Sequence, residues 1–144
     1  GFNVDKGIAD LLISLEHLRQ IDGCNGKAGT LGFCLGGFLA YKMAIESDAE
    51  CNVSYYGVGI EDHLQEAGRI VSPTVLHIAE EDSFVSKEAQ LNINKHLAAT
   101  DQIGIYNYPR VDHAFARHGG VNFDAAASEM ADERTMKCFS EYLK

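Results

Sequence analysis

The chain has 144 residues, of which 46% are hydrophobic and 23% charged, and this balance favours a single globular domain over residues 1–144. The formal net charge of −9, without a cluster of Lys or Arg, argues against nucleic acid or an anionic membrane surface as a partner. No apolar run approaches the roughly 20 residues that span a bilayer. The four cysteines are widely spaced, so we expect a cytoplasmic protein without a disulfide framework.

Helix-like and strand-like patterns alternate along the chain. Apolar residues recur at helical spacing in some segments, whereas other segments are short, continuous apolar runs that are typical of buried strands. Strands separated by helices predict a parallel sheet covered on both faces, which is an α/β fold. In chain order we expect a helix from Ile8 to Leu18 with Asp5 as its cap, a strand over 27–33, a helix over 36–46, a strand over 51–56, a strand over 74–79, a helix over 86–99, a strand over 103–108 and a helix from about residue 124.

The segment Gly32-Phe33-Cys34-Leu35-Gly36-Gly37 joins the first predicted strand to the next helix. It has the form of a nucleophile elbow, Gly-x-nucleophile-x-Gly, with cysteine as the nucleophile. In such a turn the nucleophile adopts a strained backbone conformation, and the two glycines leave room for a close approach of strand and helix. The sulfur then lies beside a helix N-terminus, whose free N–H groups stabilise a thiolate. A buried cysteine beside packing glycines is the alternative.

Two further polar residues each follow a predicted strand. Asp82 comes after the third strand and His113 after the fourth. Because active groups of parallel sheets lie beyond the carboxyl ends of the strands, we expect both residues to meet Cys34 at one edge. A nucleophile needs a base, and the base needs a third group to orient it. The chain order of nucleophile, acid and histidine is that of an α/β-hydrolase triad. Taken singly, Asp82 could be a solvated turn and His113 an unengaged loop residue. His118 is a second candidate base, farther from the strand end.

These segments resemble the dienelactone hydrolase (carboxymethylenebutenolidase) family over nearly the whole chain. The resemblance is carried by the elbow around Cys34, by Glu80-Glu81-Asp82 and by Asp112-His113-Ala114-Phe115. It implies an α/β-hydrolase fold and hydrolysis of a small ester or lactone through a thioester intermediate.

The same resemblance implies individual roles. Cys34 would be the nucleophile, His113 the general base and then acid, and Asp82 the orienting carboxylate. Arg117 would bind a substrate carboxylate, and Tyr55 would line the pocket. The N–H of Leu35 would be one oxyanion-hole donor. No cluster of side chains has metal-ligand spacing, so we expect a site without metal or other cofactor.

The chain resembles only the C-terminal part of the family's domain, a truncated α/β-hydrolase fold without the first strands and the loop that supplies a second oxyanion donor. The strand between Lys27 and Phe33 would then be an exposed edge. We therefore expect a homodimer in which two copies of this strand pair antiparallel across a two-fold axis. The competing hypothesis is a catalytically incomplete, hydrolase-derived binding or assembly module. A redox-sensing role for Cys34 is a third.

Overall fold

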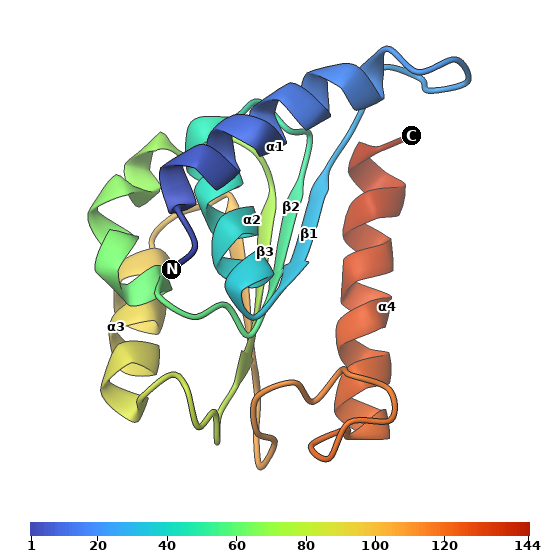
Figure 1. The fold of residues 1–144 in the computed structure, drawn as a ribbon. Coiled ribbons are helices and arrows are strands. Elements are labelled where there is room, and N and C mark those ends of the chain that lie inside the picture. The colour runs from blue at the N-terminus through green and yellow to red at the C-terminus, as the bar shows by residue number, and fades with distance from the viewer.

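The computed structural model describes residues 1–144 and contains one sheet of four parallel strands in the order β1-β2-β3-β4. Helices α2 and α3 cover one face, with α1 packed on α2, and α4 covers the other face (Figure 1). The predicted α/β architecture is confirmed. The elements are α1 (Val4–Arg19), β1 (Thr30–Phe33), α2 (Leu35–Glu46), β2 (Asn52–Tyr55), the 3₁₀ segment η1 (Ile60–Arg69), β3 (Thr74–Ala79), α3 (Lys87–Leu97), β4 (Ile103–Tyr108) and α4 (Ala125–Tyr142).

Every residue of the inner strands β2 and β3 is buried, because helices cover both faces of the sheet. In β3, Leu76 and Ile78 enter the core formed with α2, η1 and α3. The alternate residues Val75 and Ala79 enter the core formed with α4. Since all strands are parallel, the segments that follow β1, β3 and β4 all begin at one edge of the sheet. A membrane-spanning segment would need a longer and more apolar helix than any in the structure.

Three local features differ from the sequence prediction. The side chain of Asn3, not that of Asp5, caps α1, because its oxygen accepts the Lys6 N–H at 2.9 Å. The first strand begins at Thr30 rather than Lys27. The segment η1 was not expected, since its turns are short and the backbone at His63 interrupts the helical geometry.

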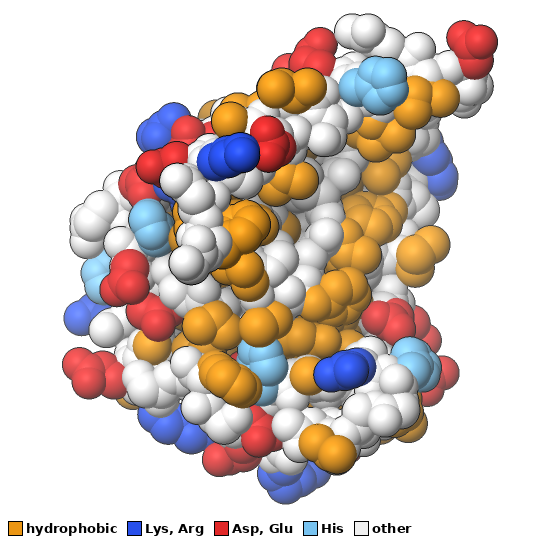
Figure 2. Space-filling view, viewed as in Figure 1, with side chains coloured by type: hydrophobic (Ala, Val, Ile, Leu, Met, Phe, Trp, Pro, Cys, Tyr) orange, Lys and Arg blue, Asp and Glu red, His pale blue; other side chains and the backbone are white.

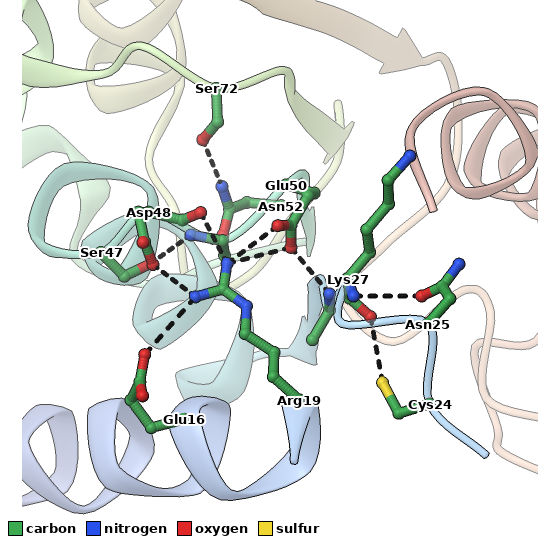
Figure 3. Close-up of polar contacts among 12 residues, drawn as sticks. Glu16, Arg19, Cys24, Asn25, Lys27, Ser47, Asp48, Glu50, Asn52 and Ser72 are labelled. Carbon is green, nitrogen blue, oxygen red and sulfur yellow. Dashed lines mark hydrogen bonds and ion pairs between the residues drawn. The ribbon is translucent and has the colours of Figure 1, made fainter. Parts of the chain in front are cut away.

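A charged cluster anchors the residues that lead into β1. Arg19, the last residue of α1, donates to Asp48 Oδ1 at 2.7 Å and to both Glu50 oxygens at 3.0 Å (Figure 3). Glu50 Oε2 also accepts the Ala28 N–H at 2.7 Å. The cluster therefore ties α1 to the segments that lead into β1 and β2, at the end of the sheet opposite Cys34.

Strand β1 lies at an edge of the sheet, as predicted, and pairs with β2 alone. Leu31 and Phe33 are each 47% exposed. Their side chains share one face because side chains alternate along a strand, and the Phe33 ring lies 4.8 Å from that of Tyr55. Figure 2 shows hydrophobic side chains gathered on this side of the molecule, between α2 and α4. The edge thus combines unpaired backbone groups with exposed apolar side chains.

Candidate active site

Cys34 occupies a sharp turn between β1 and α2. Its φ of 56° and ψ of −119° are values that residues with a side chain rarely adopt. A Cβ atom at Gly32 would lie 1.9 Å from the Gly36 carbonyl oxygen, and one at Gly37 would lie 2.6 Å from that of Tyr55. A Cβ at Gly36 would meet nothing within 4 Å. The turn is the predicted elbow, but Gly32 and Gly37, rather than Gly36, make its close approaches possible.

The elbow presents the thiol at the start of a helix. The Cys34 side chain is exposed, and its backbone N–H donates to the Tyr55 carbonyl at 3.0 Å. Helix α2 begins at Leu35, so the Leu35 N–H has no acceptor within the helix. This arrangement leaves a free backbone donor next to the sulfur-bearing residue.

His113 and Asp82 form a buried pair between the loops that follow β4 and β3. The His113 Nδ1 lies 3.1 Å from Asp82 Oδ1 and 3.0 Å from Oδ2. Only 8% of the His113 side chain and 2% of the Asp82 side chain are exposed. Asp82 Oδ1 also accepts the Phe84 N–H at 2.8 Å, which fixes the carboxylate. Because an ionised carboxylate only accepts hydrogen bonds, Nδ1 is the donor in this pair, and in the neutral imidazole Nε2 is then free to accept a proton.

Cys34, His113 and Arg117 line one cavity of about 590 Å³. Its other walls are mostly apolar and include Phe33 and Val121. The structure contains no hydrogen bond between the Cys34 thiol and the His113 imidazole, whose ring bonds Asp82. Catalytic hydrogen bonds are often long without substrate and tighten when it binds. The structure therefore brings Cys34, His113 and Asp82 to one edge of the sheet, and Cys34 and His113 line the same cavity.

The same cavity concentrates strained backbone. Four non-glycine residues have positive φ: Cys34, Tyr56, Arg110 and Ala114. All except Arg110 line the cavity. Such conformations persist only where the surrounding structure enforces them, and they cluster at functional sites. This signal is independent of the residue types that pointed to the site.

The structure corrects the prediction for Tyr55. That residue is 1% exposed and does not line the cavity. Its hydroxyl bonds Asp132 Oδ1 at 2.8 Å and Thr135 Oγ1 at 2.7 Å, both on α4. Tyr56, one residue later, lines the cavity instead, with its ring 4.9 Å from the His113 ring. Burial raises the pKa of Tyr56 to about 12, so this hydroxyl stays protonated at neutral pH.

Of the two remaining candidates from the sequence, Arg117 lines the cavity and His118 does not. Arg117 is exposed at the cavity and takes part in none of the ion pairs of the structure. His118 lies outside the cavity, with its ring 4.6 Å from that of Phe123. Of the two histidines that follow β4, His113 is therefore the one at the site.

Two residues that the sequence did not single out also contact His113. Phe84 is 66% exposed and its ring lies 4.6 Å from the imidazole. Asn122 donates from Nδ2 to the His113 carbonyl at 2.9 Å. Both line the cavity. Neither belongs to a periodic pattern, so only their positions in space reveal them. No group of three or more His, Cys, Asp or Glu side chains is arranged to hold a metal ion.

Known sequences that match most of the chain all point to one family of hydrolases. The sequence model of the dienelactone hydrolase family matches residues 2–143. Carboxymethylenebutenolidase 1 of Cupriavidus pinatubonensis is 35% identical over 136 residues, which cover 94% of this chain and 58% of that protein. Carboxymethylenebutenolidase of Pseudomonas sp. strain P51 is also 35% identical, with 94% and 57% covered. The chain thus spans a little under three fifths of the length of these relatives.

Comparison of structures shows the fold. A solved Klebsiella pneumoniae protein, described provisionally as a dienelactone hydrolase, superposes with a TM-score of 0.85 at 19% identity, covering 96% of this chain and 62% of its own. A dienelactone hydrolase-like promiscuous phosphotriesterase from metagenomic libraries gives a TM-score of 0.77 at 21% identity, covering 91% and 59%. At these identities the likeness concerns the α/β-hydrolase-like fold alone.

Proposed function

Because the chain belongs to the dienelactone hydrolase family, we propose that it acts as a cysteine-dependent hydrolase of small esters or lactones. The observation that carries the proposal is the shared cavity of Cys34 and His113, with His113 bonded to the buried carboxylate of Asp82. A nucleophile, a base and a group that orients the base are the minimum for acyl transfer by covalent catalysis.

The proposed reaction begins with proton transfer from the Cys34 thiol to His113 Nε2. The thiolate attacks the carbonyl carbon, and the Leu35 N–H donates to the negative oxygen of the tetrahedral intermediate. The intermediate collapses as the carbon–oxygen bond to the leaving group breaks, and His113 returns its proton to that oxygen. A thioester on Cys34 remains. Water, deprotonated by His113, then attacks the thioester, and the released thiolate takes the proton back.

The cavity indicates the class of substrate. Arg117 offers an exposed guanidinium without a carboxylate partner, which suits a substrate that carries its own carboxylate. Tyr56, Phe84 and Val121 provide apolar wall for a carbon skeleton. The volume of about 590 Å³ lies in the range of small-molecule sites. We therefore propose a small anionic ester or lactone.

A chromogenic ester such as p-nitrophenyl acetate tests the activity. Turnover should vanish in Cys34→Ala and fall strongly in His113→Ala. Cys24→Ala is the matched control, because Cys24 lies before β1 at the opposite end of the sheet, and this variant should keep the wild-type rate. Equal background rates in the wild type and Cys34→Ala would remove the proposed activity. A burst without turnover would instead indicate a binding or assembly module with a residual site.

We also propose that the chain forms a homodimer through β1. The edge offers unpaired N–H and C=O groups together with the exposed side chains of Leu31 and Phe33. Across a two-fold axis, β1 of a second copy can hydrogen-bond to these backbone groups and pack against these side chains. Light scattering should give a dimer for the wild type and a monomer for Leu31→Lys. Leu91→Lys, at a 70% exposed position on α3, should remain a dimer. A monomeric wild type at micromolar concentration would contradict the interface.

A further inference from the structure

We propose that Asp112 is a positioning residue that fixes the separation between His113 and Asp82. The proposal rests on the catalytic role proposed above for that pair. Asp112 does not line the cavity and its carboxylate does not bond the imidazole. It acts instead on the backbone that carries both partners.

One carboxylate oxygen makes the connection. Asp112 Oδ1 accepts the His113 N–H at 2.6 Å and the Ser83 N–H at 2.7 Å. Ser83 directly follows Asp82 along the chain. The oxygen therefore joins the loop after β3 to the loop after β4, at the catalytic histidine itself and one residue beyond the proposed acid.

The connection continues where the sheet stops. Beyond the last β3–β4 pair, the Glu80 N–H donates to the Tyr108 carbonyl and the Glu81 N–H to the Val111 carbonyl, each at 2.9 Å. After these bonds the two backbones no longer pair with each other. The side chain of Asp112 then supplies the next bond between the loops, in place of a backbone carbonyl.

The charge of Asp112 strengthens this connection. Hydrogen bonds from the His113 N–H and the Ser83 N–H hold the pKa of Asp112 below its usual value, so the group is ionised at neutral pH. Bonds from N–H groups to a carboxylate are about twice as strong as those between neutral groups. The backbone at Ala114, just past the histidine, is strained with a φ of 65°. Asp112 thus restrains the loop just before Ala114. Without this restraint, the loop would relax out of the strained conformation.

Loss of the restraint should affect catalysis more than binding. A misplacement of about 1 Å can cost about a hundredfold in rate. We expect Asp112→Ala to lower kcat for the ester by about 10- to 100-fold while KM changes by less than about threefold. Asp112→Asn keeps an oxygen acceptor at the same place and should recover kcat to within about threefold of the wild type. Asp101→Ala, at an exposed position before β4, is the matched control and should leave both constants unchanged.

A second measurement keeps the inference independent of turnover. Amide hydrogen exchange, followed by NMR, should be at least about tenfold faster at Ser83 and His113 in Asp112→Ala, and intermediate between that rate and the wild-type rate in Asp112→Asn, which keeps the acceptor without the charge. Absence of Cys34-dependent turnover in the wild type would overturn the proposed function. Exchange at the Ser83 and His113 amides would then still show whether Asp112 restrains the two loops. Unchanged exchange in Asp112→Ala would overturn the inference. So would an Asp112→Asn variant as impaired as Asp112→Ala, or wild-type kcat in Asp112→Ala.

Discussion

The backbone N–H of Cys34 donates to the carbonyl of Tyr55 at 3.0 Å, while the Tyr55 hydroxyl bonds Asp132 and Thr135 on α4. One residue of β2 therefore supports the turn that presents the sulfur and also ties the sheet to the helix behind it. The adjacent Tyr56 has the opposite character, since its ring lines the cavity and its hydroxyl makes no hydrogen bond within the protein.

This contrast predicts different effects of the same substitution at the two tyrosines. Tyr55→Phe removes two buried hydrogen bonds and should lower the free energy of unfolding by about 1–3 kcal/mol. Tyr56→Phe removes a hydroxyl without a protein partner and should change it by less than about 0.5 kcal/mol. Urea unfolding followed by circular dichroism measures both. Equal losses of stability would show that Tyr55 does not anchor α4.

Arg117 should discriminate between substrates by charge. Arg117→Gln should lower kcat/KM for an ester that carries a carboxylate by about 10- to 100-fold, the cost of a hydrogen bond to a charged group. A neutral ester of the same size should lose less than about threefold, since it makes no such bond. Arg110→Gln, outside the cavity, is the control. Equal losses with the two esters would assign Arg117 a structural role instead.

His77 should make the fold sensitive to acid. Burial, and to a smaller extent the Arg134 guanidinium, lower the pKa of His77 from its ordinary value of 6.5 to about 3. Between these two values the unfolded chain binds a proton that the folded chain does not. The free energy of unfolding should therefore fall as pH drops through this window, by up to about 1.4 kcal/mol per pH unit from this group.

The variant His77→Gln isolates that contribution. It loses the bonds from the imidazole to Tyr108 and Thr135, so its stability at neutral pH should be lower, while its decline toward acid should be shallower. His17→Gln, at an exposed position on α1, should keep the wild-type slope. Stability measured by urea unfolding at a series of pH values gives both slopes. Identical slopes in the wild type and His77→Gln would contradict the prediction.

Arg19 should contribute more to stability than an ordinary surface arginine. Its side chain is 14% exposed and bonds Asp48 and Glu50, whereas Arg69 is 58% exposed with contacts of 3.6 and 3.9 Å. Arg19→Met should lower the free energy of unfolding by about 1–3 kcal/mol. Arg69→Met should change it by less than about 1 kcal/mol. Comparable effects in the two variants would argue that the cluster does not anchor the entry to β1.

The fold could be predicted where local pattern decides structure. Strands β3 and β4 have the predicted bounds because both are rich in apolar and aromatic residues, and because Pro73 directly precedes the first and Pro109 directly follows the second. The sequence identifies Cys34 as the residue of an elbow because the turn requires a glycine two positions earlier, at residue 32, for local steric reasons. The strained φ that the elbow demands is present.

The rest of the site depends on contacts between distant parts of the chain. Tyr55 and Tyr56 are adjacent, and which of them faces the cavity depends on where β2 ends and on the positive φ of Tyr56. Asp112 bonds Ser83, 29 residues earlier, and no local pattern reveals that bond. Phe84 is recognised as a site residue only because its ring packs on His113.

The most direct test of the proposed mechanism is to find which residue carries the acyl group during the reaction. The protein is mixed with p-nitrophenyl acetate, quenched with acid and analysed by peptide mass mapping. The proposed mechanism predicts an acetyl group on the peptide that contains Cys34, absent in Cys34→Ala and longer-lived in His113→Ala, because the mechanism has His113 activate the water that removes it. Acetylation that avoids Cys34, with turnover unchanged in Cys34→Ala, would contradict it.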